Sequence, residues 1–252
     1  MKTLQYGRPA SFAQKMPLPR RQFLKGVASL GALAFLSYLM PSCSESTDLA
    51  STEAMPGAGG ELPEPRKDSD VSIEETLLKR RSIRSYSRGA LTLAEVSQLL
   101  WAAQGVTSAR GFRTAPSAAA TYTLETYLLV GDVDNLTEGV YRYKPAGHSL
   151  VKLLDGDYRP RLTRETAGRY FVEGGAIYIL FTGVYSRIGA GDEGVKYVHM
   201  EVGHAAQNVY LQAVALGLGT VVNGGIDADG IREILELPVT EEPLYFMPVG
   251  RL

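Results

Sequence analysis

An α+β fold is predicted for residues 71–252, and three features of the sequence carry that prediction. Two segments with helical periodicity open with capping boxes, and several short runs are rich in β-branched and aromatic residues. One long segment repeats small and apolar residues at helical spacing. Helices and strands in this mixed order are typical of an α+β domain.

Composition restricts the class of protein. The chain has 252 residues, 45% of them hydrophobic and 21% charged, so it is neither collagen-like nor wholly disordered. The net charge of −1 hides an asymmetry, because residues 1–44 carry six basic residues and no acid. The other 20 basic residues face all 27 acidic ones, so this part lacks the basic surface of a nucleic-acid-binding protein.

Residues 1–43 have the layout of an export signal, in which a basic stretch precedes a charge-free run over 26–40. That run is shorter than the ~20 apolar residues of a permanent membrane helix. Arg20 and Arg21, with Phe-Leu-Lys close behind, resemble a twin-arginine signal, whose translocase accepts folded cargo. The prediction is export across the inner membrane to the periplasm or cell envelope. The alternative is a basic helix start before an ordinary membrane anchor.

Cys43 is the only cysteine and cannot form an internal disulfide. It lies just after the apolar run ends, and residues 39–43 resemble a bacterial lipobox, in which the cysteine becomes the lipidated first residue. A lipid at Cys43 would be the only membrane contact of the mature chain. The alternative is an inert cysteine in a segment that another peptidase removes.

Residues 44–70 are predicted to be a disordered acidic linker. They consist mainly of Ser, Thr, Ala, Gly, Pro and acids, with seven acidic residues against two basic ones. Such a segment buries too little apolar surface to offset the entropy cost of ordering it. The folded domain is therefore expected to begin at residue 71.

The helices are predicted from their caps and from their periodicity. Ser72 with Glu75 opens a helix that ends near residues 79–81, and Thr92 with Glu95 opens one over 93–103. The long segment 192–216 is expected to be a largely buried helix that Gly217 terminates, and another helix begins after Asp227.

The strands are predicted from short runs of β-forming residues. Residues 123–130 and the apolar run 176–182 are expected to be strands, the second of them buried. Residues 140–143 and 149–154 form a predicted hairpin around a Pro-Ala-Gly turn at 145–147. The short runs 220–222 and 244–249 complete the order.

Candidate chemistry begins at the end of the first helix. Arg80, Arg81, Ser82 and Arg84 place three guanidiniums and a hydroxyl within five residues, a set of donors that matches phosphate oxygens. On composition alone, a solvated charged face is the favoured interpretation. Further motifs follow in order at 115–120, 203–208, 216–225 and 248–251, and together they favour a binding site.

These motifs resemble the nitroreductase family of FMN proteins, most closely its SagB-type dehydrogenase branch, from about residue 73 to residue 251. The resemblance implies a nitroreductase-like homodimer, with a mostly antiparallel central sheet, flanking helices and a long central helix. It places Pro116, Ser117 and Ala118 against the flavin from the neighbouring subunit, and Gly224 and Gly225 near the flavin N5. The phosphate ligands that it implies are Arg80, Arg81, Ser82, Arg84 and Arg251.

Glycine at 224 and 225 suits close approach of backbone N–H groups to a flat ring. Better-known members of the family often have Glu at the place of Gly224. Because the flavin itself takes the hydride, no indispensable acid or base side chain is expected. The alternative for the glycine pair is a plain turn after a strand.

Gln207 and Asn208 are interpreted as buried amides first and flavin contacts second. No metal site is predicted, because His199 and His204 are five residues apart and the zinc pattern His-Glu-x-x-His is absent around Glu201. The glycines of residues 189–191 lack the phosphate-loop pattern and its lysine, so nucleotide triphosphate binding is not supported.

The predicted function is an exported FMN-dependent oxidoreductase. The resemblance implies ping-pong use of the flavin, which moves two electrons between a small organic substrate and a second partner. One alternative is an NAD(P)H-dependent nitroreductase whose N-terminus is misjudged, and another is a flavin-binding lipoprotein without turnover. Loops 105–114 and 185–193 are expected to set specificity.

Overall fold

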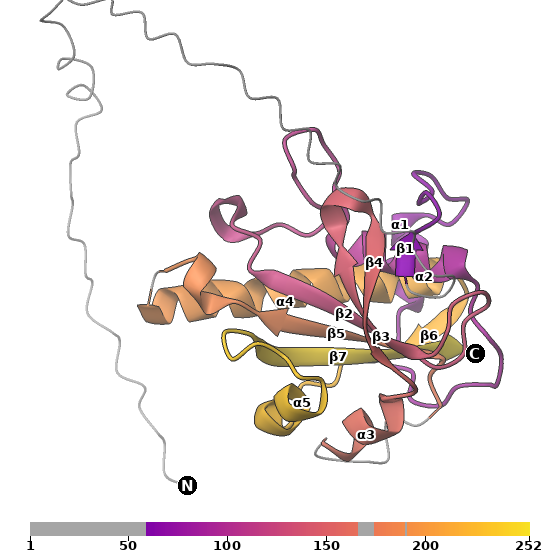
Figure 1. Ribbon diagram of the computed structural model, residues 1–252. Helices are drawn as coiled ribbons and strands as arrows, with labels where there is room; N and C mark the ends of the chain where they lie inside the picture. The colour runs from indigo at the N-terminus through magenta and orange to yellow at the C-terminus, as the bar shows by residue number, and fades with distance from the viewer. Residues whose placement is uncertain (1–58, 166–173, 190) are drawn as a thin grey trace, which may run out of the picture. The chain divides into compact units, whose positions relative to one another are not determined.

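A computed structural model describes residues 59–165, 174–189 and 191–252 (Figure 1). The predicted export signal, Cys43 and residues 44–58 lie outside the described residues. Within the described ranges, no helix combines the length and the apolar composition that a membrane crossing requires.

One antiparallel sheet organises the described residues. Its strand order is β1-β4-β3-β2-β5-β7-β6, and every pairing between neighbouring strands is antiparallel. The predicted α+β class with a mostly antiparallel sheet is confirmed. The strands are β1 (Gly59–Glu61), β2 (Leu124–Val130), β3 (Gly139–Lys144), β4 (Ser149–Asp155), β5 (Ile177–Gly183), β6 (Leu218–Thr220) and β7 (Glu242–Arg251).

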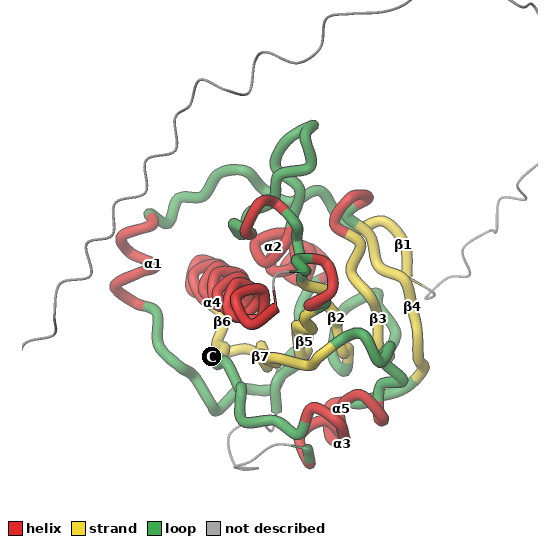
Figure 2. Tube along the Cα trace, turned by 90° about the vertical axis from the view of Figure 1, so that its left-hand side faces the viewer, coloured by secondary structure: helices red, strands yellow, loops and turns green. Residues whose placement is uncertain are grey.

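Helices cover both faces of this sheet (Figure 2). The longer α2 and α4 lie on one face with α1 beside α4, and the short α3 and α5 lie on the other. Two apolar cores result, because alternate residues of each strand point to opposite faces: Leu128 points toward α4, and Leu129 points toward α3 and α5. The helices are α1 (Ile73–Lys79), α2 (Leu93–Gln104), α3 (Arg159–Arg164), α4 (Gly191–Ala215) and α5 (Ala228–Ile234).

The predicted helix starts are confirmed by their caps. The Ser72 hydroxyl accepts the Glu75 N–H at 3.1 Å, and Thr92 with Glu95 forms a complete capping box. Helix α4 starts at Gly191 and ends at Ala215, one residue from each predicted bound. Strand β6 is displaced from the predicted 220–222 to Leu218–Thr220, and the single turn of α3 was not predicted.

The predicted disorder of the linker is wrong for residues 59–70. Strand β1 pairs with β4, Leu62 is buried, and the Ser97 hydroxyl donates to the Pro63 carbonyl. Gln98 of α2 exchanges two hydrogen bonds with the backbone of Arg66. The average composition of the segment hides this, because one apolar side chain and backbone pairing are enough to dock it on an existing domain.

Candidate functional site

Tyr210 of α4 joins two of the predicted site segments. Its hydroxyl lies 3.2 Å from Ser82 Oγ and accepts the Val222 N–H at 2.8 Å, while the Arg80 guanidinium lies over its ring at 5.1 Å. The segment after α1 reaches this point because the Ile83 N–H donates to the Thr220 carbonyl at the end of β6. Residues 80–84 and 220–225 therefore meet at the C-terminal half of α4.

The arginines of residues 80–84 differ in their contacts. Arg81 is exposed and donates only to backbone carbonyls, those of Leu78 and Arg80. Arg84 donates to the Ser82 carbonyl at 3.4 Å. In the part of the chain that the structure describes, no carboxylate forms an ion pair with Arg80 or Arg81, so both guanidiniums are available to an anion.

The Gly224–Gly225 pair lies in a tight turn beside β7. Asn223 exchanges two backbone hydrogen bonds with Phe246, and its side chain accepts the Gly225 N–H at 3.2 Å. A Cβ on Gly224 would come within 2.9 Å of the Tyr245 ring, so a larger residue there requires that ring to move. Both glycines are exposed, but the Gly225 N–H is already donated to Asn223, so the accessible backbone of this turn excludes that group.

Arg251 is the predicted phosphate ligand whose donors are already in use. It binds Glu95 through two bonds, of 2.6 and 2.9 Å, and donates to the Ala90 carbonyl from two nitrogens. Burial alone would raise the pKa of Glu95, but hydrogen bonds from Arg251 and Thr92 outweigh it and lower the pKa. Arg251 thus ties the end of β7 to α2, with one of its five N–H donors left over.

Pro116, Ser117 and Ala118 lie elsewhere along α4. The Ser117 hydroxyl donates to Glu201 at 2.7 Å, and His204 Nδ1 lies 3.3 Å from the Pro116 carbonyl. Glu201 precedes Tyr210 by nine residues, which is roughly 13 Å along a helix. One chain therefore does not bring this segment into contact with the Arg80–Ser82 cluster.

The segment after Ser117 has a strained backbone. Ala119, Ala120 and Tyr122 have φ angles of 52°, 54° and 49°, in the left-handed region that disfavours residues with a Cβ. Each such residue costs on the order of 1 kcal/mol or more. Contacts with α4 must offset this cost for the segment to keep its conformation.

The interpretation of Gln207 and Asn208 as buried amides is wrong. Gln207 is exposed and Asn208 is half-buried, because they lie on the face of α4 that points away from the sheet. Asn208 lines a cavity of about 340 Å³ between α1, α2 and α4, together with Trp101 and Leu211. Helical periodicity predicted that the helix is largely buried, but it did not predict that Gln207 and Asn208 lie on its outward face.

The three polar residues of α4 that were examined as metal ligands, His199, Glu201 and His204, each contact a residue outside the helix. His199 Nε2 lies 2.8 Å from the Tyr185 hydroxyl, Glu201 binds Ser117, and His204 contacts Pro116. Among the residues that the structure describes, no three His, Cys, Asp or Glu side chains are placed to share a metal ion.

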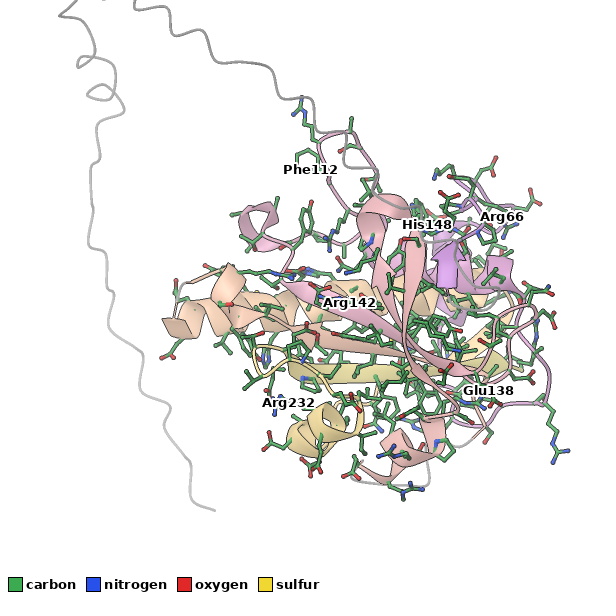
Figure 3. The ribbon with its side chains drawn as sticks, in the orientation of Figure 1. Arg66, Phe112, Glu138, Arg142, His148 and Arg232 are labelled. Atoms are coloured by element: carbon green, nitrogen blue, oxygen red, sulfur yellow. The ribbon has the colours of Figure 1, made fainter. Side chains whose placement is uncertain are left out.

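Two features of this region were not predicted from the sequence. The first is Tyr210, which is buried in the long helix. The one signal for its role is that a buried tyrosine hydroxyl needs a hydrogen-bond partner. The other is Phe112, which lies on the projecting loop 105–114 with 45% of its surface exposed (Figure 3). A large exposed aromatic ring on a loop is a candidate contact for a substrate or a partner.

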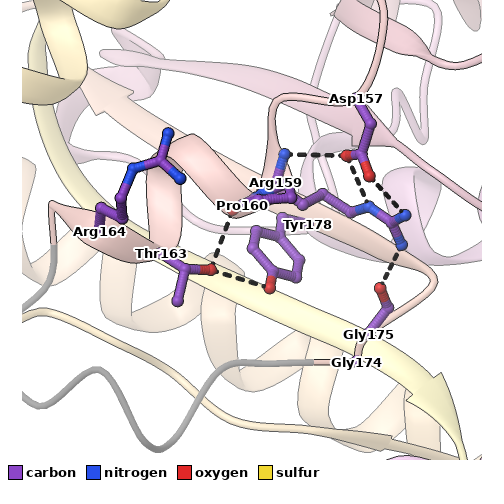
Figure 4. A pocket seen from close by; sticks show the side chains of 8 residues that line it. All are labelled: Asp157, Arg159, Pro160, Thr163, Arg164, Gly174, Gly175 and Tyr178. Atoms are coloured by element: carbon purple, nitrogen blue, oxygen red, sulfur yellow. Dashed lines mark hydrogen bonds and ion pairs between the residues drawn. The ribbon is translucent and has the colours of Figure 1, made fainter.

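A further cavity, of about 380 Å³, lies beside α3 (Figure 4). Arg159, bound to Asp157, forms one wall, and the paired hydroxyls of Thr163 and Tyr178 form another. None of the predicted site residues lines it. The candidate site is therefore assigned to the α4 side.

Comparisons with known proteins identify the family that this chain resembles. Residues 77–251 match the nitroreductase family. A protein of Methanocaldococcus jannaschii described as a nitroreductase is 48% identical over 184 residues, which cover 72% of this chain and 92% of that one. An NADPH-dependent FMN reductase of Bacillus subtilis is 26% identical, over 70% of this chain and 64% of its own length. A crystal structure of a Ralstonia eutropha nitroreductase superposes with a TM-score of 0.69 at 30% identity, covering 77% of this chain and 89% of that one.

Proposed function

The chain belongs to the nitroreductase family and is an oxidoreductase, and from this premise we propose that it is an exported FMN enzyme of the SagB type. It transfers two electrons between a small organic substrate and a second partner. The observation that carries the proposal is the junction at Tyr210, where the Arg80 guanidinium, the Ser82 hydroxyl and the segment that leads to the Gly224–Gly225 pair meet.

The donors at this junction fit the phosphate of FMN. Arg80 and Arg81 supply guanidiniums without a described carboxylate partner, and Ser82 supplies a hydroxyl. The Tyr210 hydroxyl accepts the Val222 N–H, and we propose that it gives its own proton to Ser82 Oγ. Ser82 can then donate its proton to a phosphate oxygen. Arg251 supports the site through Glu95 and contributes at most one donor to the phosphate.

The glycine turn fits the ring system of the same cofactor. Bound FMN would accept and return a hydride, and the protein supplies position and electrostatics. Asn223 binds the turn to β7, so the backbone of Gly224 and Gly225 is held in a fixed position beside the sheet. Glycine at 224 departs from the better-known members of the family, which often have Glu at that place. The flavin is proposed to be used in ping-pong order, with one substrate leaving before the next binds.

A homodimer completes the proposed site. The outward face of α4 exposes Met200, Gly203 and Gln207, and a Cβ on Gly203 would meet no described atom within 4 Å beyond its own stretch of helix. A second copy on this face would bring its own Pro116, Ser117 and Ala118 toward the flavin. The contacts of Gln207 and Asn208 would then be made across the subunit boundary.

Export separates the proposal from its alternatives. No nicotinamide pool is maintained outside the cytoplasm, so export favours dehydrogenation of a substrate or coupling to a quinone. The similarity to an NADPH-dependent FMN reductase favours the second candidate, an NAD(P)H-dependent nitroreductase. A flavin-binding lipoprotein without turnover, anchored at Cys43, is the third.

Analysis of the purified protein tests the cofactor and the reaction class together. The released cofactor is identified by its absorption and mass, and reduction of the bound flavin by NADPH is followed in a stopped-flow instrument. FMN that NADPH reduces only slowly, and that an organic substrate or a quinol reduces quickly, supports the proposal. Fast reduction by NADPH supports the nitroreductase, and the absence of any flavin contradicts the proposed function.

Replacement of Arg20 and Arg21 by Lys tests the export route. A translocase for folded cargo can export a protein that already holds FMN, whereas a threading route would strip a non-covalent cofactor. The double variant should accumulate in the cytoplasm with FMN bound. If it instead reaches the periplasm or envelope as the unchanged protein does, the twin-arginine assignment is wrong.

A further inference from the structure

Glu201 lies in the N-terminal half of α4 with only 2% of its surface exposed. Its Oε2 accepts hydrogen bonds from the Ser117 hydroxyl at 2.7 Å and from the Thr123 hydroxyl at 2.8 Å. The Thr123 N–H adds a third at 3.3 Å. One carboxylate oxygen therefore fixes both ends of residues 117–123, the segment that leads into β2.

These residues need such a fixation, because their backbone is strained. Ala119, Ala120 and Tyr122 all have left-handed φ angles, and such residues keep that conformation only where the surroundings impose it. The Ser117 hydroxyl closes the segment on itself by accepting the Tyr122 N–H at 2.9 Å. The proton of Ser117 is thus used on Glu201, and only backbone groups around Ser117 remain available to a cofactor.

Arg113 holds the same segment from its other side. Its guanidinium stacks on the Tyr122 ring at 4.5 Å and donates to Gln104 of α2 at 2.9 Å. Residues 117–123 are therefore held by hydrogen bonds to Glu201 and by the contact of Tyr122 with Arg113.

Stability of the fold is a weak reason to bury this carboxylate. Its Oε1 has no hydrogen-bond partner among the described residues, and a buried charge with incomplete hydrogen bonding is costly. We propose that Glu201 is a positioning residue for the flavin, which acts through Ser117 and Thr123 to set the backbone of residues 116–118 against the cofactor. This assignment rests on the proposed function.

The test measures FMN binding and the environment of bound FMN in the purified full chain. The variants are Glu201→Ala, Glu201→Gln, Ser117→Ala and the double variant of Glu201→Ala with Ser117→Ala. Glu241→Ala is the matched control, since Glu241 is also buried and its Oε2 also accepts two hydroxyl hydrogen bonds, from Tyr127 and Thr182. The readouts are the Kd for FMN by fluorescence quenching, the visible circular dichroism and potential of bound flavin, and the Tm of the flavin-free protein.

Glu201→Ala should raise the Kd for FMN at least tenfold and change the visible circular dichroism. Ser117→Ala should also raise the Kd for FMN. The Kd of the double variant should not exceed that of the weaker-binding single variant, because both substitutions remove the same hydrogen bond between Ser117 and Glu201. Glu201→Gln should restore binding to within about threefold, since its amide oxygen can replace Oε2 and its nitrogen takes the place of the unpartnered Oε1. Glu241→Ala should lower the Tm and leave the Kd unchanged.

Three results would overturn the assignment. The first is a Glu201→Ala variant that lowers the Tm and leaves the Kd, dichroism and potential of the flavin unchanged. The second is additivity of the two single substitutions. The third result is relevant if Glu201→Ala does not fold. In that case, a Ser117→Ala variant that binds FMN with the normal Kd, dichroism and potential would overturn the assignment. An unchanged protein that binds no FMN would instead overturn the proposed function, and the assignment with it.

Discussion

Glu201 and Glu241 are two buried carboxylates that lie on opposite faces of the sheet and differ in what they connect. Each uses its Oε2 to accept hydrogen bonds from two hydroxyl groups at 2.7 to 2.8 Å. Glu241 joins Tyr127 of β2 to Thr182 of the neighbouring β5, and Arg142 lies 3.5 Å from its Oε1. Glu201 joins a helix to a strained loop, and its Oε1 is left without a described partner.

Under the proposed role of Glu201, one face of the sheet serves stability and the other serves cofactor binding. On the α5 face the buried charge is compensated and connects regular strands, so its main effect is to stabilise the sheet. On the α4 face a partly satisfied charge holds a conformation that the backbone would otherwise leave. Arg187 links the two, because it donates to the Tyr122 carbonyl and pairs with Glu125 beside Arg142.

The largest expected effect is on the α5 face. Glu241→Ala leaves two buried hydroxyls without an acceptor and should lower the free energy of unfolding by about 3 kcal/mol. Urea denaturation of the flavin-free protein measures this. Glu242→Ala, which removes a more exposed carboxylate next in the sequence, should cost less than about 1 kcal/mol. A large loss of FMN affinity in folded Glu241→Ala would contradict the separation of the two faces.

The second effect is on cofactor binding. Arg80→Ala removes a charged donor to phosphate and should weaken FMN binding at least tenfold, as expected for a contribution of about 1.5 to 3 kcal/mol. Arg161→Ala is the control, because Arg161 also lies over a tyrosine ring, that of Tyr158, but on α3. Titration of flavin fluorescence should leave Arg161→Ala indistinguishable from the unchanged protein. Equal affinities in all three proteins would return Arg80 to the role of a solvated surface charge.

The third effect belongs to Tyr210. Tyr210→Phe keeps the ring under Arg80 but removes the hydroxyl between Ser82 and Val222, so FMN binding should weaken by about fivefold, or about 1 kcal/mol. Tyr178→Phe removes a buried hydroxyl on the other face and should alter stability only. Isothermal titration calorimetry distinguishes the two variants. Normal affinity in Tyr210→Phe would mean that Ser82 needs no orientation.

The smallest effect concerns the strain itself. Glycine at position 120 adopts the left-handed conformation without a Cβ penalty, so Ala120→Gly should stabilise the flavin-free protein by up to about 1 kcal/mol. Ala118→Gly, two residues earlier and outside the left-handed set, should destabilise it by about 0.5 to 1 kcal/mol. Thermal unfolding compares them. A loss of stability in Ala120→Gly would show that no strain is stored there.

The parts predicted from sequence are those that depend on near neighbours. Capping residues and periodicity are local, so the helix starting at Ile73, the two ends of α4 and the main strands were predicted to within a few residues. The contacts of the site are not local: Arg251 meets Glu95, and Tyr210 meets Ser82, across more than a hundred residues. Residue types alone do not specify such pairings.

The left-handed backbone of Ala119 and Ala120 could not be predicted from the sequence for a different reason. Sequence rules assign left-handed backbone to glycine and asparagine, and nothing in Ala119 or Ala120 signals it. The conformation is imposed from outside by Glu201 and Arg113. The same holds for β1, since three residues with two glycines become a strand only because β4 offers them an unpaired edge.

Strand β1 also sets where the chain can be cut. It covers the outer edge of β4, a strand on which Val151 and Leu153 are 44% and 45% exposed. A protein shortened to residue 71, the boundary that composition suggests, would leave that edge bare and invite edge-to-edge aggregation between molecules. Any truncation of the chain, including the choice of an expression boundary, therefore has to spare residues 59–67 if the protein is to stay dispersed.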